Sequence, residues 1–250
     1  MLIIGITGKK GSGKSTLADA IVKYCTTKNF RSAELSFASA LKSICVDIFN
    51  INIQNFIDPE LKNIKIDKKY FEKPTSRQKK IKVISSKFGY SSLKSNQILL
   101  SIFESLKLIK KNCTNLPNAG IVHALINLNN ITPREIMQVV GVIFPSSGNK
   151  NVWIDIINEK LATMEKYDAV IISDVRFVNE LTSILSKKKR CLIKINRPSL
   201  QRNSESDNHI SETELDDFES FFDHIIFNTH ESPFSFQEHA MSTILPSLVI

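Results

Sequence analysis

Several marks of secreted, membrane-bound and disulfide-rich proteins are absent from this chain. No stretch approaches the roughly 20 apolar residues that a membrane-spanning helix needs, and no basic region precedes an apolar one at the amino terminus. The 4 cysteines are widely scattered and include no Cys-x-x-Cys pair, so they predict free thiols rather than disulfides. We therefore expect a cytoplasmic protein that makes no membrane contact.

Internal repeats and the composition of a disordered chain are also missing. Of the 250 residues, 42% are hydrophobic and 23% are charged, which is ordinary for a folded domain with a sizeable core. No regular sequence period indicates a solenoid. The length suits one large α/β domain, or one such domain that carries an insertion.

The charge of the chain is unbalanced. A formal net charge of +8 and a pI near 9.2 favour an anionic partner, either nucleic acid or nucleotides. A basic run, RQKKIK, occupies residues 77–82, but few aromatic residues accompany it and no nucleic-acid-binding module is recognisable. We interpret this run as a solvated, Lys-rich loop and do not expect nucleic acid as a partner.

Residues 8–15, GKKGSGKS, carry the most informative pattern in the chain. They match the phosphate-binding loop, in which a glycine and four free positions precede Gly-Lys-Ser, and they follow an apolar strand at 2–6. Backbone N–H groups of such a loop surround an anion, and the helix that follows directs its positive end at the phosphates. We predict that a nucleoside triphosphate binds here, on Gly8, Gly11, Ser12, Gly13, Lys14, Ser15 and Thr16.

The remaining elements alternate between strand and helix patterns. Thr132, Pro133 and Glu135 have the residue types of a helix start with a capping box. Apolar runs predict strands at 32–37, 169–174, 191–195 and 224–228, and helical spacing predicts helices at 15–24, 38–44, 93–109, 133–140, 152–164, 178–185 and from about 236. This order predicts an α/β fold, a three-layer α/β/α arrangement around a five-stranded parallel sheet.

Two segments interrupt the alternation. Between about 50 and 130, Lys, Asn, Ser and Ile follow one another irregularly, which indicates an inserted, mostly helical or irregular subdomain. A polar segment at about 197–217 separates the fourth predicted strand from the fifth. We therefore expect a single domain over residues 1–250 with an insertion at about 50–130 and a lid at about 197–217.

Arginines bracket the predicted lid. Arg197 and Arg202 would either close over a transferring phosphoryl group or lie in a solvated loop. The His209, Ser211, Glu212 and Glu214 cluster lacks the spacing of a metal site, so we interpret its members as lid contacts or helix caps. Ser211 with Glu214 predicts a capped helix near 213–220.

Asp174 and Arg176 follow the apolar run at 169–173. A carboxylate at the carboxyl end of a parallel strand lies at the edge where α/β sheets bind ligands, and it can hold hydrated magnesium or position an acceptor. Arg176 is close enough in sequence to share that cleft. The alternative is an ordinary surface ion pair between the two side chains.

A further candidate group lies between the insertion and this strand. Arg134, Gln138 and Gly141 would share one side of the helix that begins at Pro133, where they could read an anion and a base edge or form a solvated face. Trp153 is the only tryptophan, and its indole could stack on a base or fill the core.

Together these motifs resemble the deoxynucleoside monophosphate kinases of large DNA phages and viruses, within the nucleoside monophosphate kinase family. The resemblance rests on GKKGSGKST at 8–16, SALK at 39–42, PREIMQVVG at 133–141, VWI at 152–154, SDVRFVNE at 173–180, NRP at 196–198 and HISE at 209–212. It covers both ends of the chain and leaves about 60–130 weakly matched. It implies transfer of the ATP γ-phosphoryl group, with Mg²⁺, to a deoxynucleoside monophosphate (dNMP), and the host-cell cytoplasm as the location of a viral enzyme.

The resemblance also implies roles for single residues. Lys14 would bind the ATP phosphates, Ser15 and Asp174 would hold magnesium, and Arg197 would act from the lid on ATP and the transferring phosphate. The catalytic residues would be Lys14, Asp174, Arg176 and Arg197. The acceptor would contact Lys10, Lys42, Arg134, Gln138, Gly141, Trp153, Asp174, Arg176 and Glu180, and the insertion would contribute to its site.

Alternative functions remain open at this point. The same fold logic serves kinases of other small acceptors, such as dephospho-coenzyme A or phosphomevalonate. The charge of +8 and the run at 77–82 would also suit a nucleotide-regulated DNA-binding protein. The sequence leaves a homodimer open as well.

Overall fold

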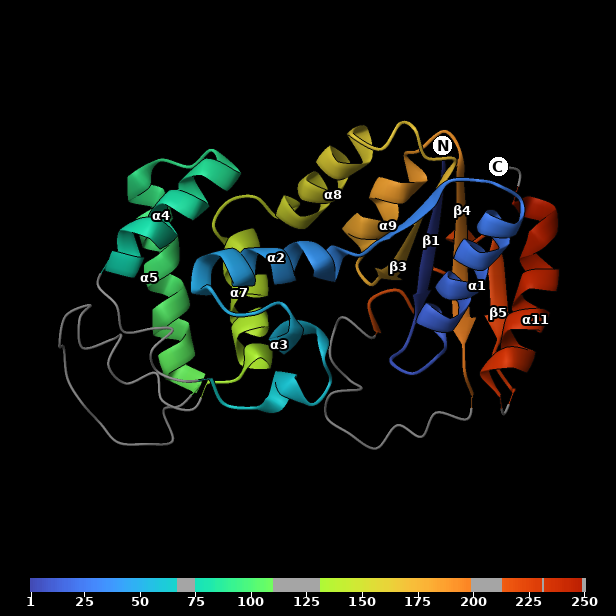
Figure 1. Cartoon of the computed structure of the whole chain (residues 1–250), viewed down its shortest axis with the longest axis horizontal. Helices are drawn as coiled ribbons and strands as arrows, with labels where there is room; N and C mark the ends of the chain where they lie inside the picture. The colour runs from blue at the N-terminus through green and yellow to red at the C-terminus, as the bar shows by residue number, and fades with distance from the viewer. Residues whose placement is uncertain (67–74, 110–130, 199–212, 231, 249–250) are drawn as a thin grey trace. The chain divides into compact units, whose positions relative to one another are not determined.

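The computed structural model describes residues 1–66, 75–109, 131–198, 213–230 and 232–248 (Figure 1). The chain forms two compact units, one made of Met1–Ala38 with Trp153–Ile250 and the other of Ser39–Val152. The insertion predicted at about 50–130 falls inside the second unit. Whether the two units make up one domain, as the sequence suggests, stays a prediction.

A parallel sheet forms the centre of the first unit. Its strand order is β2-β3-β1-β4-β5, and every neighbouring pair is parallel. Strand β1 lies in the middle because its residues are apolar on both faces, as expected for a strand covered by helices on both sides. The five strands are β1 (Leu2–Gly8), β2 (Ser32–Leu35), β3 (Ala169–Val175), β4 (Arg190–Asn196) and β5 (His224–Phe227), which confirms the predicted fold class.

Helices cover both faces of this sheet. On one face, α1 (Lys14–Thr27) and α11 (Pro233–Ile244) pack on alternate residues of the strands, including Ile4 and Ile6 (Figure 1). On the other face lies α9 (Val178–Leu185), so close that a Cβ built on Gly5 would be 2.9 Å from Ile184 Cδ1. The sheet is therefore the middle layer of an α/β/α arrangement.

The second unit is helical in the residues that the structure describes. Its core contains aromatic pairs, with Phe49 against Phe103 at a centroid distance of 6.0 Å and Phe88 against Phe144 at 4.6 Å. Its elements are α2 (Phe37–Phe49), which begins in the first unit, α3 (Gln54–Ile57), the 3₁₀ helix η1 (Leu61–Asn63), α4 (Thr75–Phe88), α5 (Ser92–Ile109) and α7 (Pro133–Ser146).

The start of α7 confirms the predicted capping box. Thr132 Oγ1 accepts a hydrogen bond from the Glu135 backbone N–H at 3.2 Å, and the Glu135 carboxylate accepts one from the Thr132 N–H at 2.8 Å. Pro133 occupies the first turn, where its missing N–H costs no hydrogen bond. The helix continues to Ser146, beyond the predicted end at 140.

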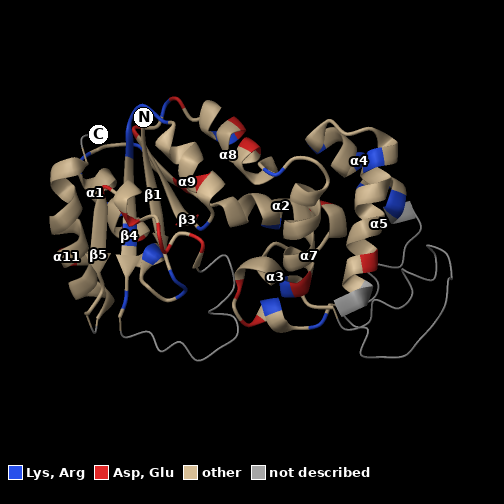
Figure 2. Ribbon diagram, turned by 180° about the vertical axis from the view of Figure 1, so that it is seen from behind, with Lys and Arg blue, Asp and Glu red and all other residues tan. Residues whose placement is uncertain are grey.

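The basic run at 77–82 is helical, so its interpretation as a loop was wrong. It lies within α4, along which Figure 2 shows several Lys and Arg positions. Ile81, Ile84 and Phe88 recur at the three- and four-residue spacing of a helix face, and lysine itself favours helices. Lys80 is only 5% exposed, so the run is not uniformly solvated.

Further elements differ from the prediction. Phe37 begins α2 instead of ending β2. Of the residues 213–220 where a helix was predicted, only Thr213 is helical, and turns at 214–217 and the 3₁₀ helix η4 (Glu219–Phe221) follow it. There the carbonyl oxygens of Leu215 and Asp216 accept hydrogen bonds from Lys194 Nζ, at 3.2 and 3.1 Å. These carbonyls are thus bonded to a side chain instead of serving the backbone hydrogen bonds of an α-helix. Arg202, His209, Ser211 and Glu212 lie outside the described residues.

The remaining described elements complete the chain. They are α8 (Val152–Ala162) and the 3₁₀ helix η5 (Leu245–Ser247). Cys25, Cys45 and Cys191 are buried free thiols, as predicted, and Cys113 lies outside the described residues. Within the described ranges, no helix combines the length and apolar character that crossing a bilayer requires.

Candidate active site

The turn between β1 and α1 has the backbone of a phosphate-binding loop. Gly8, Gly11 and Gly13 have φ angles of 147°, 78° and 110°, in the region that only glycine adopts without strain. A Cβ on Gly8 would lie 2.6 Å from the Ile195 carbonyl oxygen and 2.6 Å from Ser12 Oγ. The loop is therefore pressed against β4, and its first glycine has no room for a side chain.

The loop fits a phosphate group. Lys14 Nζ donates to the carbonyl oxygens of Gly8 and Lys9, at 2.5 and 2.8 Å, which holds the ammonium group over the loop. Ser12 Oγ is buried and has no hydrogen-bond partner in the described protein. A buried hydroxyl without a partner is costly, and a bound anion would give it an acceptor. The positive end of α1, which begins at Lys14, faces the same loop.

A cavity of about 300 Å³ adjoins the loop on the side of β5. One wall is the loop itself, with Gly11, Gly13, Lys14, Ser15 and Thr16. The opposite wall consists of residues that are not among the predicted site residues, namely Asn228, His230, Ser232, Pro233 and Phe236. The sequence offered one indication of this wall, which is the position of Asn228 directly after β5. The carboxyl ends of parallel strands meet at one edge of a sheet, and ligands bind at that edge.

Arg197 lines this cavity as well, and it follows the end of β4. Its Nη1 donates to the Gly11 carbonyl oxygen at 3.1 Å. The guanidinium group therefore contacts the phosphate loop directly. Its planar, permanently charged donors suit phosphate oxygens better than an ammonium group does.

Asp174 lies at the end of β3, next to β1 in the sheet. Its two carboxylate oxygens accept hydrogen bonds from the N–H groups of Phe37 and Ala38, each at 2.8 Å. The side chain therefore stabilises the first turn of α2.

Glu180 braces the turn that carries Arg176. Its Oε2 accepts hydrogen bonds from the backbone N–H groups of Arg176 and Phe177, at 2.8 and 3.2 Å. The side chain is 5% exposed, and burial, assisted by the nearby negative charge of Asp174, raises its pKa to about 8. The structure thus gives Glu180 a role in shaping the Asp174–Arg176 turn, while its predicted contact with an acceptor stays a prediction.

The side chains available for magnesium are oxygen donors. Ser15 is exposed in the first turn of α1, and Asp174 is half-buried at the neighbouring strand end. In the part of the chain that the structure describes, no three His, Cys, Asp or Glu side chains gather into a metal cluster. A hydroxyl and a carboxylate fit a hard cation that takes its other ligands from phosphate oxygens and water.

The other predicted site residues are spread over both units. Lys10 lies exposed in the phosphate loop, and Trp153 is half-buried on α8, both in the first unit. Lys42 is half-buried on α2, and Arg134, Gln138 and Gly141 occupy α7, all in the second unit. Arg134 Nε donates to Asn63 Oδ1 at 3.0 Å, and a Cβ on Gly141 would be 3.4 Å from Leu41 Cδ2.

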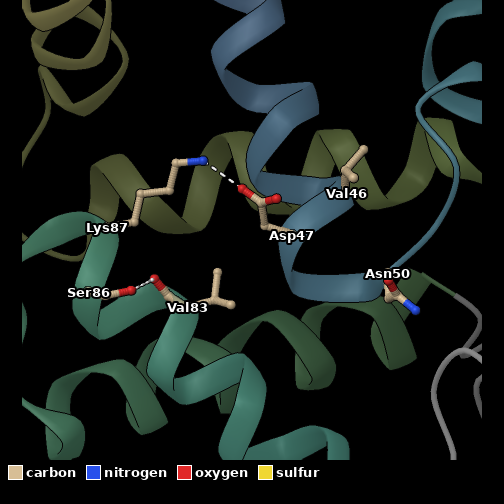
Figure 3. A pocket seen from close by; sticks show the side chains of 6 residues that line it. All are labelled: Val46, Asp47, Asn50, Val83, Ser86 and Lys87. Carbon is tan, nitrogen blue, oxygen red and sulfur yellow. Dashed lines mark hydrogen bonds and ion pairs between the residues drawn. The ribbon is translucent and has the colours of Figure 1, made fainter.

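The second unit has a surface cavity of its own, of about 470 Å³, between α2 and α4 (Figure 3). Lys87 Nζ and Asp47 Oδ2 form an ion pair of 2.6 Å across it. Val46, Asn50, Val83 and Ser86 complete the lining. It includes none of the predicted acceptor residues, so we do not assign the acceptor to it.

The fold and the loop define a P-loop kinase. In agreement, the family model described as deoxynucleotide monophosphate kinase matches residues 2–232, and the chain belongs to this family. It is therefore a deoxynucleoside monophosphate kinase, a phosphotransferase, which confirms the resemblance. One relative is the deoxynucleoside-5'-monophosphate kinase of Escherichia phage T5, 25% identical over 182 residues, which cover 72% of this chain and 70% of the relative.

Proposed function

We propose that this enzyme transfers the γ-phosphoryl group of ATP to the phosphate of a deoxynucleoside monophosphate, giving the diphosphate and ADP. The observation that carries the proposal is the 300 Å³ cavity in which the phosphate loop, Arg197 and Phe236 meet. Its volume is at the lower end of the roughly 300–1,000 Å³ of small-molecule sites, and it joins a cationic end to an aromatic one. A nucleoside triphosphate has the same division into an anionic and an aromatic part.

In this proposal, the protein binds ATP both at its phosphates and at its base. Lys14, the first-turn amides of α1 and the Ser12 hydroxyl bind the phosphates, because they are the positive and hydrogen-donating groups of the loop. The base lies against Phe236 and His230, whose ring centroids are 6.5 Å apart. Asn228 and Arg197 lie along the same wall.

Charge stabilisation is the main chemical task of such a site. The negative charge of the γ-phosphoryl group is spread over its oxygens. Lys14 and Arg197 would stabilise this charge during transfer. Both cations are already positioned by backbone carbonyls, at Gly8, Lys9 and Gly11, so little reorganisation is needed when the charge shifts. Ser15 and Asp174 would hold magnesium, which when bound neutralises part of the phosphate charge.

The acceptor contacts are also part of the proposal. Arg176 and Asp174 would position the acceptor phosphate at the end of β3, and Glu180 would keep their turn in shape through its two backbone hydrogen bonds. Further contacts are proposed for Lys10, Lys42, Arg134, Gln138, Gly141 and Trp153. Side chains of these types supply positive charge, an amide and an aromatic surface, which suit a phosphate and a base.

A steady-state panel tests the proposal. ADP formation from ATP and magnesium would be measured with dTMP, dGMP, dCMP, dAMP and their ribose counterparts, and with dephospho-coenzyme A and phosphomevalonate. We expect turnover with at least one dNMP, and Lys14→Ala should reduce it by roughly a hundredfold or more while the variant stays folded. Turnover confined to another acceptor, or a folded Lys14→Ala variant of normal activity, would refute the proposal.

A further inference from the structure

Asn228 is anchored where β5 ends. It is 4% exposed, and its backbone N–H donates to the Asn196 carbonyl oxygen at 2.7 Å, which extends the pairing of β4 and β5 by one residue. The backbone position of Asn228 is therefore fixed by the sheet. Its side chain starts from a rigid base.

The side-chain amide of Asn228 links two parts of the cavity wall. Its Nδ2 donates to the Ser12 carbonyl oxygen at 2.9 Å, within the buried interior. Its Oδ1 accepts a hydrogen bond from the His230 backbone N–H at 3.3 Å. A carbonyl needs a donor and an N–H needs an acceptor, so the orientation of the amide is determined by its partners.

The bond to Ser12 sets the direction of the next backbone N–H. A trans peptide is planar, so the Ser12 carbonyl and the Gly13 N–H point in opposite directions. With the carbonyl held on Asn228, the Gly13 N–H points away from Asn228. If this peptide rotated, the negative end of the carbonyl would turn into a loop built to bind phosphate.

The geometry around Gly13 leaves little room for another arrangement. A Cβ on Gly13 would lie 3.0 Å from Asn228 Nδ2 and 2.8 Å from Phe236 Cε1. Gly13 also has a φ of 110° at the start of α1. The amide of Asn228 and the ring of Phe236 thus pack closely against Gly13, which precedes the first residue of α1.

We propose that Asn228 is a positioning residue for the phosphoryl donor, because it fixes the Ser12–Gly13 peptide of the phosphate loop and the turn at His230 with one amide. The inference rests on the proposed function, in which ATP occupies the cavity that Asn228, Gly13 and His230 line. Asn228 acts through the loop. Its loss should weaken donor binding and leave acceptor binding unchanged, because none of the proposed acceptor residues is among its hydrogen-bond partners.

The test compares Asn228→Asp with Asn158→Asp. The carboxylate introduced by Asn228→Asp would face the Ser12 carbonyl without a proton to donate, whereas Asn158, on α8, accepts a hydrogen bond from Lys187 Nζ at 2.8 Å and has no part in the loop. We expect Asn228→Asp to raise the KM for ATP by about tenfold or more, because a buried hydrogen bond to the loop is lost and a negative charge is added to the wall of the ATP cavity. The KM for the dNMP should stay within about twofold, and Asn158→Asp should change neither constant.

A direct binding measurement separates positioning from a general loss of stability. The rise in melting temperature on adding ATP should be smaller for Asn228→Asp than for the wild type at the same ATP concentration. Asn228→Ala removes the same side-chain hydrogen bonds without adding a charge, so it should show the same selective loss and separates loop positioning from charge repulsion. A variant with a lower melting temperature but an unchanged ATP affinity, or with both KM values raised alike, would overturn the inference. Absence of dNMP turnover in the wild type would instead refute the proposed function.

Discussion

Lys9 of the phosphate loop forms an ion pair of 2.9 Å with Asp216. Asp216 lies in the turn that Lys194 holds from β4 through the carbonyl oxygens of Leu215 and Asp216 and the carboxylate of Glu219. This turn therefore places a negative charge beside a loop whose function is to bind negative charge. The pair is partly exposed, with side chains 28% and 43% accessible, so it adds little to stability.

Asp216→Asn should strengthen donor binding. The substitution removes a carboxylate from beside the loop and releases Lys9 to face phosphate, so we expect the KM for ATP to fall roughly threefold at low salt. The exposed neighbour Asp217 provides a control with the same change in net charge. An equal decrease for Asp217→Asn, or an effect that persists undiminished at high salt, would argue against a local role of the pair.

Arg197→Ala should reduce kcat more than it changes either KM. The guanidinium at the Gly11 carbonyl is proposed to stabilise the transferring phosphoryl group, and loss of one such donor typically costs on the order of a hundredfold in rate. Arg190→Ala is the matched control, because Arg190 is exposed at the opposite end of the same strand. A change confined to the KM for ATP would show that Arg197 binds only the ground state.

Glu180→Gln should make the enzyme more stable in weakly alkaline solution. Burial raises the folded pKa of Glu180 to about 8, so the folded state binds more protons than the unfolded state between the ordinary value of 4.5 and about 8. The stability that this provides is present below pH 4.5 and is lost as pH rises to about 8. Glutamine can still accept both backbone hydrogen bonds without a charge.

Denaturant unfolding at several pH values checks this prediction. The free energy of unfolding of Glu180→Gln should exceed that of the wild type by at least about 1 kcal/mol at pH 8, and the difference should shrink toward pH 5. Glu238→Gln, at an exposed position of α11, should show no such trend. A difference that does not change with pH would mean that Glu180 is ionised throughout.

Lys80→Met should stabilise the protein near neutral pH. Lys80 is 5% exposed, its ammonium lies 5.8 Å from the centroid of the Phe49 ring, and burial lowers its pKa to about 8. The unfolded state therefore binds more protons between about 8 and 10.5, and the stability of the wild type should rise with pH across that range. Methionine keeps the apolar stem without the charge.

We expect Lys80→Met to raise the free energy of unfolding by about 1–3 kcal/mol at pH 7, with a smaller gain at pH 10. Lys79→Met removes an exposed lysine from the same helix and should have little effect. Equal changes for the two variants at both pH values would contradict a destabilising, buried ammonium at Lys80.

The sheet and the phosphate loop could be predicted because their signals are local. Ala169–Val175 is an uninterrupted apolar run apart from its polar end, and the Gly-Lys-Ser spacing of the loop follows such a run directly. The capping box of Thr132 and Glu135 also lies within four consecutive residues. In each case the residues that interact are neighbours in the sequence.

The missed features depend on distant partners. Asn228 is 216 positions away from Ser12, and nothing near Asn228 in the sequence indicates a hydrogen bond to the loop. Lys194 is a charged residue within a buried strand, where its partners come from the turn around residue 216. The lysines of α4 concealed the helical spacing of Ile81 and Ile84, because a basic run resembles a solvated loop. Tertiary contacts decide all these cases.

The packing of Phe236 against Gly13 has a practical consequence for truncation. The family match ends at residue 232, whereas Phe236 belongs to α11, which begins at Pro233. A shortened chain designed on the extent of that match would keep the whole phosphate-loop motif and yet remove the aromatic wall beside it. It would also expose the apolar residues of β1 and α1 that α11 covers. Such a chain would fail through aggregation as well as through weak nucleotide binding, even though every recognisable motif was retained.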